Sequence, residues 1–145
     1  MTAMKKYPLP PCLQKANGLT EEAFRRWLQR KAQAHVRRDK DPRRKRQAVT
    51  AGAYKLRIYD AVIESQGRDY FTGQSLRWDL VSKWNNEEAE SGGAAYRKEF
   101  WELPSVDHDG DAFRICSWRM NDSKNDQTIA EFLELADAVR RHLRP

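Results

Sequence analysis

The stretch 100–118 contains two runs of strand-like residues separated by a turn sequence at 109–111. The first run is rich in aromatic and aliphatic residues and leads up to Asp107 and His108, and the second spans residues 113–118. Strand-like composition on both sides of a tight turn is typical of a β-hairpin. Because the second strand returns the chain beside the first, we expect the start of the next helix to lie close to Asp107 and His108.

Two helices are predicted before this hairpin. Thr20 is a suitable N-cap, and acidic residues follow it in the first turn, where the helix dipole favours anions. This basic, amphipathic helix is expected to end near Asp39, because Pro42 restricts the residue before it and lacks a donor. A second helix is expected over 47–66, with Gly67 as its C-terminal cap. The apolar stripe of the first helix comprises Phe24, Trp27, Leu28 and Lys31, and that of the second comprises Tyr54, Leu56, Ile58, Tyr59, Val62 and Ile63.

A third helix is predicted near the end of the chain, where Thr128 and Glu131 have the spacing of a capping box. Its apolar face predicts that it packs over the core. Between the second helix and the hairpin, the aromatic segment 70–78 predicts a short hairpin or knuckle, and residues 85–93 predict a solvated loop. Together these elements predict an α+β fold. The apolar face of the last helix comprises Ile129, Phe132, Leu133, Ala136, Val139 and Leu143.

Positive charge is concentrated in the first part of the chain. Residues 1–50 contain 14 Lys or Arg against 4 Asp or Glu, whereas residues 51–145 contain 13 against 17. Dense Lys and Arg gain affinity for nucleic acid by releasing phosphate counterions, so we expect 1–50 to be a basic binding arm and 51–145 a domain with a different role. A solvated face or a flexible tail is the alternative. The predicted nucleic-acid contacts are Arg25, Arg26, Arg30, Arg37, Arg38, Arg43, Arg44, Lys45 and Arg46, with Arg119 from the later part of the chain.

The chain of 145 residues is long enough for one modest hydrophobic core. Cys12 and Cys116 are its only cysteines, too few for a disulfide framework or a four-thiolate zinc site. No stretch approaches the roughly 20 apolar residues that a membrane span needs. We therefore expect a reduced, cytoplasmic protein with no membrane partner. His35 and His142 are expected to be surface residues.

The candidate chemistry lies at the end of the hairpin and the start of the following helix. Asp107 and Asn121 offer two hard oxygen ligands to a divalent cation, with water and a substrate phosphate completing the shell. His108 can take a proton from an attacking water, because histidine has an ordinary pKa near 6.5. Lys124, one turn after Asn121, can place a cation near the phosphate. In the simpler interpretation, Asp107 caps a turn at His108, Asn121 is a helix N-cap and Lys124 is a solvated lysine.

The sequence from Val106 to Asp126 resembles the HNH signature of the ββα-metal (His-Me finger) endonucleases. The matching part extends over about 70–126. The resemblance implies a ββα-metal core, with two further helices before it and one after it. It also implies that Asp107 and Asn121 bind Mg²⁺ or another divalent cation such as Mn²⁺, and that His108 is the general base. Cleavage in that family leaves a 3′-hydroxyl and a 5′-phosphate.

Two features depart from the family pattern. Many members carry Cys-x-x-Cys pairs that bind a structural zinc, and this chain has none, so no structural zinc is expected. The family's middle Asn, in the turn before the second strand, has no clear match, and Asp111 is the nearest residue.

We therefore expect a metal-dependent endonuclease that hydrolyses phosphodiester bonds of nucleic acid, with DNA as the target. In this scheme Lys124 or Arg119 neutralises phosphate charge, and the Arg-rich segment 25–46 contacts the backbone without reading sequence. One alternative is a non-catalytic nucleic-acid-binding module on the same fold. Another is an interaction protein whose basic helix binds an acidic partner.

Overall fold

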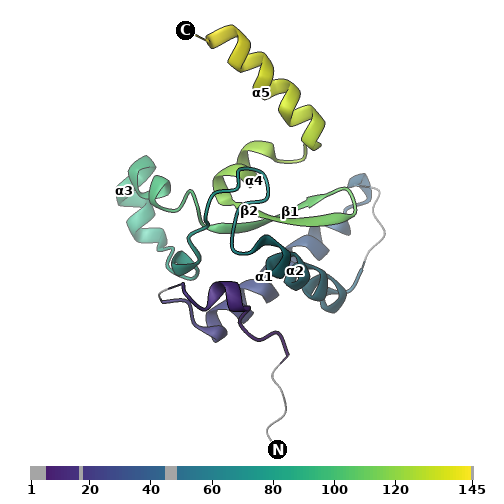
Figure 1. The fold of residues 1–145 in the computed structure, drawn as a ribbon, viewed down its shortest axis with the longest axis vertical. Coiled ribbons are helices and arrows are strands. Elements are labelled where there is room, and N and C mark those ends of the chain that lie inside the picture. Colours follow the sequence, from purple (N-terminus) through teal and green to yellow (C-terminus); the bar gives the residue numbers. More distant parts are fainter. Residues whose placement is uncertain (1–5, 17, 45–48, 145) are drawn as a thin grey trace, which may run out of the picture.

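The structure is a computed structural model that describes residues 6–16, 18–44 and 49–144. Within these ranges the chain forms five α-helices and one two-stranded antiparallel sheet (Figure 1). This mixture of helices with a small sheet confirms the general α+β class. In chain order the elements are α1 (Glu21–Asp39), α2 (Ala51–Ser65), α3 (Asn86–Glu99), β1 (Pro104–Asp109), β2 (Ala112–Ser117), α4 (Trp118–Lys124) and α5 (Ile129–Leu143).

The predicted hairpin is confirmed. β1 and β2 pair antiparallel, with Pro104 opposite Ser117 and Asp109 opposite Ala112. Gly110 completes the tight turn with a φ of 59°, a conformation that a residue without a Cβ adopts at little cost. The return strand leads directly into α4, so the start of α4 lies beside β1, as the sequence predicts.

The first helix begins and ends where the sequence predicts. The Thr20 side chain accepts a hydrogen bond from the backbone N–H of Ala23, and the helix ends at Asp39. The second helix is shorter than predicted, because Thr50 caps it and it begins at Ala51. At its other end Gln66 is the C-cap, with φ 54°, and Gly67 directly after it also has a positive φ, of 79°.

The hydrophobic core joins both helices to the hairpin. Phe24 and Leu28 from α1, Ile58 from α2 and Ile115 from β2 are almost fully buried in one cluster. The core therefore draws on residues from both sides of residue 50. The exposed positions on the predicted face of α2 are Leu56 and Ile63.

Hydrogen bonds from α1 fix its position along β1. Trp27 donates from Nε1 to the carbonyl oxygen of Pro104 at 3.2 Å. Two turns later, His35 Nε2 lies 3.0 Å from the carbonyl oxygen of Val106. Because a carbonyl oxygen only accepts, His35 carries its proton on Nε2. His35 is 4% exposed, so the expectation that it is a surface residue is wrong.

Asp69 ties the aromatic segment to the start of α4. One oxygen of its buried carboxylate accepts hydrogen bonds from the backbone N–H groups of Phe71 and Thr72, and the other accepts from Ser117 N–H at 3.0 Å. The predicted knuckle is therefore a turn closed by a bridge between Arg68 and Ser75 and held on the hairpin by one side chain.

The expectation of a solvated loop over 85–93 is wrong, because α3 occupies most of it. Asn85 caps the helix by accepting hydrogen bonds from the N–H groups of Glu87 and Glu88. Gly93, with φ 55° and ψ −135°, interrupts the helix without ending it. An aromatic contact holds this exposed helix against the segment that precedes it. Trp84 packs against Tyr96 of α3, with ring centroids 5.1 Å apart.

The expectation that the last helix packs over the core is also wrong. The predicted capping box is present, with Thr128 and Glu131 bonded to each other's backbone, and α5 forms as expected. However, α5 has no buried residue, and Figure 1 shows it extending away from the sheet. Amphipathic spacing correctly predicted the helix. Its apolar face, however, does not pack against another described element of this chain.

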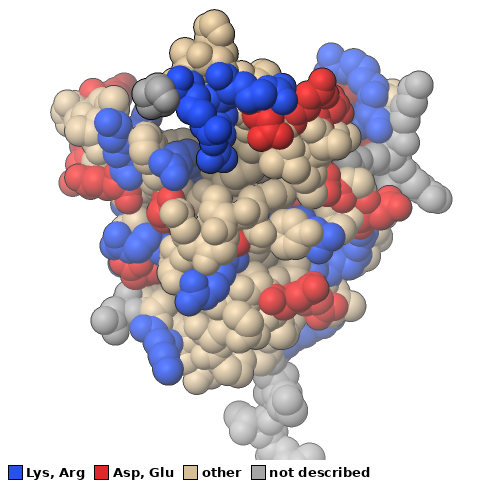
Figure 2. Space-filling model, turned by 45° about the horizontal axis from the view of Figure 1, so that its top comes forward, with Lys and Arg blue, Asp and Glu red and all other residues tan. Residues whose placement is uncertain are grey.

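Charges of both signs are mixed on the surface, as Figure 2 shows for one face of the molecule. In the described ranges, no helix combines the length and the apolar character that crossing a membrane requires.

We predict that His35 makes the folded state acid-sensitive. Burial first, and then the charge of Arg38, lower the pKa of His35 from 6.5 to about 4. The unfolded chain therefore takes up a proton near pH 6.5 that the folded chain refuses until about pH 4, so stability is lost as the pH falls through this window. The loss reaches about 3 kcal/mol at the acid end. Urea unfolding of wild type and His35→Gln between these pH values measures it.

In His35→Gln this part of the pH dependence is expected to disappear, because the amide can still donate but does not titrate. The exposed His142→Gln serves as the control and should retain the wild-type slope. Equal slopes in wild type and His35→Gln would show that His35 is not the group responsible.

Candidate active-site cleft

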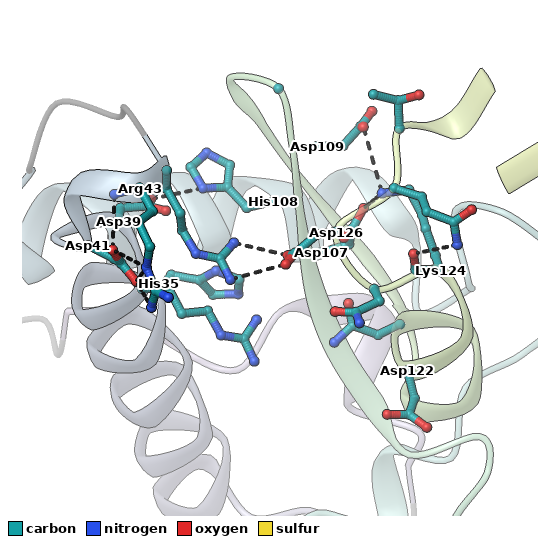
Figure 3. A pocket seen from close by; sticks show the side chains of 17 residues that line it. His35, Asp39, Asp41, Arg43, Asp107, His108, Asp109, Asp122, Lys124 and Asp126 are labelled. Atoms are coloured by element: carbon teal, nitrogen blue, oxygen red, sulfur yellow. Dashed lines mark hydrogen bonds and ion pairs between the residues drawn. The ribbon is translucent and has the colours of Figure 1, made fainter. Parts of the chain in front are cut away.

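A cleft of about 730 Å³ lies where the end of α1 meets the end of β1 (Figure 3). One wall comes from the last turn of α1 and the segment that follows it. The opposite wall comes from α4 and the link to α5, and the last residues of β1 lie between them. The residues that line it are His35, Arg38, Asp39, Asp41, Arg43, Arg44, Asp107, His108, Asp109, Gly110, Asn121, Asp122, Lys124, Asn125, Asp126, Gln127 and Thr128.

The cleft brings together all four residues predicted to carry the chemistry. Asp107 and His108 are neighbours on β1, and successive side chains of a strand point to opposite faces. Accordingly, His108 points toward α1 while Asp107 contacts Lys124 of α4, on opposite sides of the strand in Figure 3. Asn121 lines the same cleft from α4.

His108 is held by a carboxylate that the sequence does not place near it. Its Nδ1 lies 3.0 Å from Oδ2 of Asp39, the last residue of α1, and both side chains are less than a tenth exposed. Tyr54 of α2 donates its hydroxyl proton to the same carboxylate oxygen. The His108 ring also stacks on Phe113 across the hairpin, with centroids 4.2 Å apart.

This arrangement selects one tautomer of the neutral imidazole. A proton on Nδ1 of His108 is donated to the Asp39 carboxylate, which leaves the lone pair on Nε2. The carboxylate also stabilises the imidazolium that forms when Nε2 takes up a proton. A buried His–Asp pair of this kind is well suited to general-base catalysis.

Lys124 and Asp107 form a buried ion pair. Lys124 Nζ lies 3.0 Å from Asp107 Oδ2 and 3.8 Å from Asp109 Oδ1, and the Lys124 side chain is 3% exposed. The interpretation of Lys124 as a solvated lysine is therefore wrong. Its ammonium group lines the cleft with two carboxylates around it.

Asn121 does not cap α4. Ser117 is the N-cap, and its hydroxyl accepts a hydrogen bond from the N–H of Met120 at 3.0 Å. Asn121 lies one turn further into the helix, with Nδ2 3.3 Å from Ser105 Oγ. The capping interpretation of Asn121 is therefore wrong. That of Asp107 as the cap of a turn at His108 is wrong too, because both residues lie within β1.

The oxygen donors of Asp107 and Asn121 fit a largely hydrated Mg²⁺. This cation keeps several waters and takes one or two carboxylates together with substrate phosphate oxygens, so a dense protein cage is not required. Among the described residues no group of three or more His, Cys, Asp or Glu side chains is arranged to hold a metal. A carboxylate and an amide on facing elements of one cleft are, however, the donor types that Mg²⁺ accepts. A cation bound there competes with Lys124 for Asp107.

The predicted phosphate-binding residues divide into separate groups. Arg38, Arg43 and Arg44 line the cleft, and Arg43 and Arg44 pair with Asp41 and Asp126 at 2.7 and 3.0 Å. Lys45 and Arg46 lie outside the described residues.

The remaining arginines lie away from this cleft. Arg30 and Arg37 line a second groove of about 700 Å³ between α1 and the segment 80–84. Arg25 pairs with Glu21 at 2.8 Å and Arg26 with Glu22, each one turn earlier in α1. Arg119 lies 3.7 Å from Glu102 and stacks its guanidinium on the Trp101 ring.

Sequence reasoning missed Asp39, Tyr54 and the buried state of His35. His35 lies four residues beyond Lys31, so it continues the apolar stripe of the first helix, and this spacing could have identified it as a packed residue. For Asp39 and Tyr54 no local signal exists, because their contact with His108 depends on how α1 and α2 pack against the hairpin.

Comparison of the chain with known protein families, with curated proteins and with solved structures finds no match.

Proposed function

We propose that this chain is a metal-dependent endonuclease that hydrolyses phosphodiester bonds of nucleic acid, with DNA as its expected target. The observation that carries the proposal is His108, which is buried on β1, is oriented by Asp39 and lines a cleft together with Asp107, Asn121 and arginines. A titratable side chain that lies in a cleft with a specific charged partner is a candidate for a functional site. The ββα-metal assignment of β1, β2 and α4 is part of the same proposal.

His108 acts as the general base in the proposed reaction. Its Nε2 accepts a proton from the attacking water, while Nδ1–H continues to donate to Asp39. Asp39 also accepts a hydrogen bond from the Tyr54 hydroxyl, which holds the carboxylate in place beside the imidazole. The leaving 3′-oxygen takes up a proton from solvent, and His108 then releases its proton to solvent, which restores the neutral ring.

Asp107 and Asn121 would hold the divalent cation in this scheme. When bound, Mg²⁺ or Mn²⁺ neutralises charge on the phosphate and on the leaving oxygen. Lys124 places an ammonium group on the same side of β1, where it contacts the carboxylates of Asp107 and Asp109. Once a divalent cation is bound to Asp107, the charges of the cation and of Lys124 together outweigh those of the two carboxylates, and the substrate phosphate would meet a net positive charge.

The arginines of the cleft account for substrate binding. Arg38, Arg43 and Arg44 project from the end of α1 and the segment after it, on the wall that faces α4. Their guanidinium groups can contact phosphates on one side of the scissile bond of a nucleic-acid strand, while His108 and Lys124 lie near that bond. Phosphate contacts of this kind position the backbone and carry no sequence information.

We predict that His108→Ala lowers plasmid cleavage by about 10²- to 10⁴-fold, the usual worth of a general base. Asp39→Asn keeps the size of the side chain but weakens a charge-assisted hydrogen bond of about 1.5–3 kcal/mol, so we expect a loss of about 10- to 100-fold. Conversion of supercoiled plasmid to nicked and linear forms with Mg²⁺, with Mn²⁺ and with EDTA measures both effects.

The exposed His142→Ala is the matched control and should cleave as wild type does. Thermal unfolding of each variant separates a lost reaction from a lost fold. Full activity in correctly folded His108→Ala would exclude the mechanism.

We further predict that Arg38→Gln combined with Arg43→Gln weakens binding to all DNA sequences alike. Each phosphate contact contributes about one unit to the slope of log K against log salt, so the double variant should lose about two units of slope. Fluorescence anisotropy with two unrelated duplexes over a salt series measures the slope. The control is Lys83→Gln with Arg97→Gln, two exposed positions that do not line the cleft, and it should leave the salt slope unchanged. A loss of affinity that differs between the two duplexes would contradict backbone binding.

A non-catalytic nucleic-acid-binding module is the second candidate, and the Lys124–Asp107 contact of 3.0 Å favours it. An ammonium group paired with the predicted metal ligand can replace the cation, and the cleft then binds phosphate without cutting it. The two candidates differ in whether the wild-type protein binds a divalent cation at all.

Our account predicts that wild type binds Mn²⁺ and that Asp107→Asn binds it about tenfold or more weakly, because a charged ligand is lost. Paramagnetic resonance of free Mn²⁺ during a titration measures the affinity. Asp122→Asn, an exposed carboxylate at the cleft margin, is the matched control. The binding-module interpretation predicts no Mn²⁺ binding in wild type and a gain of binding in Lys124→Met, because that change releases Asp107.

A further inference from the structure

The apolar face of α5 has the spacing of a helix that packs against another helix. Its apolar residues follow one another at alternating intervals of three and four, which places them on one stripe of the helix. None of them is fully buried: Ile129 and Phe132 are half-buried, and Val139 and Leu143 are 49% and 69% exposed. The stripe comprises Ile129, Phe132, Ala136, Val139 and Leu143.

This face lacks a partner within the described part of the chain. Figure 1 shows α5 extending from the end of α4 with no other element alongside it. An isolated helix of 15 residues is marginally stable in water even with a good N-cap, and most helical stability in proteins comes from packing an apolar face. A continuous exposed apolar stripe is typical of an interaction surface.

The charges of α5 indicate what covers the stripe. Acidic side chains lie in its first part, at Glu131, Glu134 and Asp137, and basic side chains lie in its last part, at Arg140 and Arg141. A parallel pair of identical helices would set like charges side by side. An antiparallel pair sets the acidic part of each helix beside the basic part of the other, so each helix complements a second copy of itself.

We propose that α5 pairs antiparallel with α5 of a second copy of this chain. The small residue Ala136 lies at the middle of the stripe, where a two-fold axis allows the helices to approach closely. On either side of that axis Ile129 faces Leu143 of the partner subunit. The pair buries the apolar stripes of both copies. The two clefts lie at opposite ends of the paired helices because Thr128, the N-cap of α5, lines the cleft.

The test compares two substitutions of the same kind on one helix. Ala136→Glu places a charge in the middle of the stripe, whereas Ala138→Glu places the same charge on the opposite, exposed side. Sedimentation velocity of the full chain measures the mass. Wild type and Ala138→Glu are expected at twice the chain mass of 17.0 kDa, and Ala136→Glu at the chain mass. Circular dichroism verifies that all three are folded.

Salt tests the orientation of the helices, and charge reversal tests whether their charges contribute to pairing. An antiparallel dimer weakens in high salt, whereas a parallel one strengthens because like charges are screened. Glu134→Lys with Asp137→Lys, and Arg140→Glu with Arg141→Glu, should each be monomeric alone and should form a mixed dimer together, with the capping box at Glu131 intact. Monomeric wild type, dimeric Ala136→Glu or strengthening by salt would each overturn the proposal, independently of any result on cleavage.

Discussion

The contact between α1 and β1 is the constraint on which the rest of the structure depends. From His35 to Asp39 the helix rises about 6 Å, and from Val106 to His108 the strand advances about 6.6 Å, so the two elements match in register at this point. His35 meets the Val106 carbonyl oxygen and Asp39 meets His108. One turn of helix thus positions both the strand and the imidazole that it carries.

Two buried ion pairs follow from the alternation of side chains along β1. His108 and Asp107 are adjacent, so one pairs with Asp39 of α1 and the other with Lys124 of α4. Each carboxylate lies within 3.0 Å of a nitrogen that is positively charged or that becomes so when it takes up a proton. In low dielectric this offsets the desolvation cost of the carboxylates and raises the cost of removing either partner alone. The cleft therefore has buried ion pairs where the proposed chemistry takes place, and it is lined with exposed arginines where a polyanion would enter.

Local patterns predicted the elements well where they carry caps and turns. Thr20, the turn at Gly110 and the Thr128–Glu131 capping box each fixed an element from a few neighbouring residues. The prediction of a loop over 85–93 was wrong because Asn85 is the N-cap of a helix and not a loop residue. The hairpin also predicted that α4 returns beside Asp107, so the meeting of Asp107, Asn121 and Lys124 in one cleft followed from topology. The roles of Asp39 and Tyr54 could not be predicted in this way. Both residues are distant from His108 in the sequence, and only tertiary packing brings them into contact with it. Periodicity identified the apolar face of α5, but it cannot state whether that face covers the same chain or another copy.

The most direct test of the account is the tautomer of His108, read from the ¹⁵N chemical shifts of the imidazole nitrogens in uniformly labelled protein. The chain has three histidines, which His35→Gln and His108→Ala assign. The account predicts that neutral His108 carries its proton on Nδ1, facing Asp39, and that His35 carries its proton on Nε2, facing Val106. The two buried histidines should therefore show opposite tautomers in one spectrum, and Asp39→Asn should disturb His108 alone. A proton on Nε2 of neutral His108 would contradict the account, because the nitrogen that must accept the proton from water would already carry one.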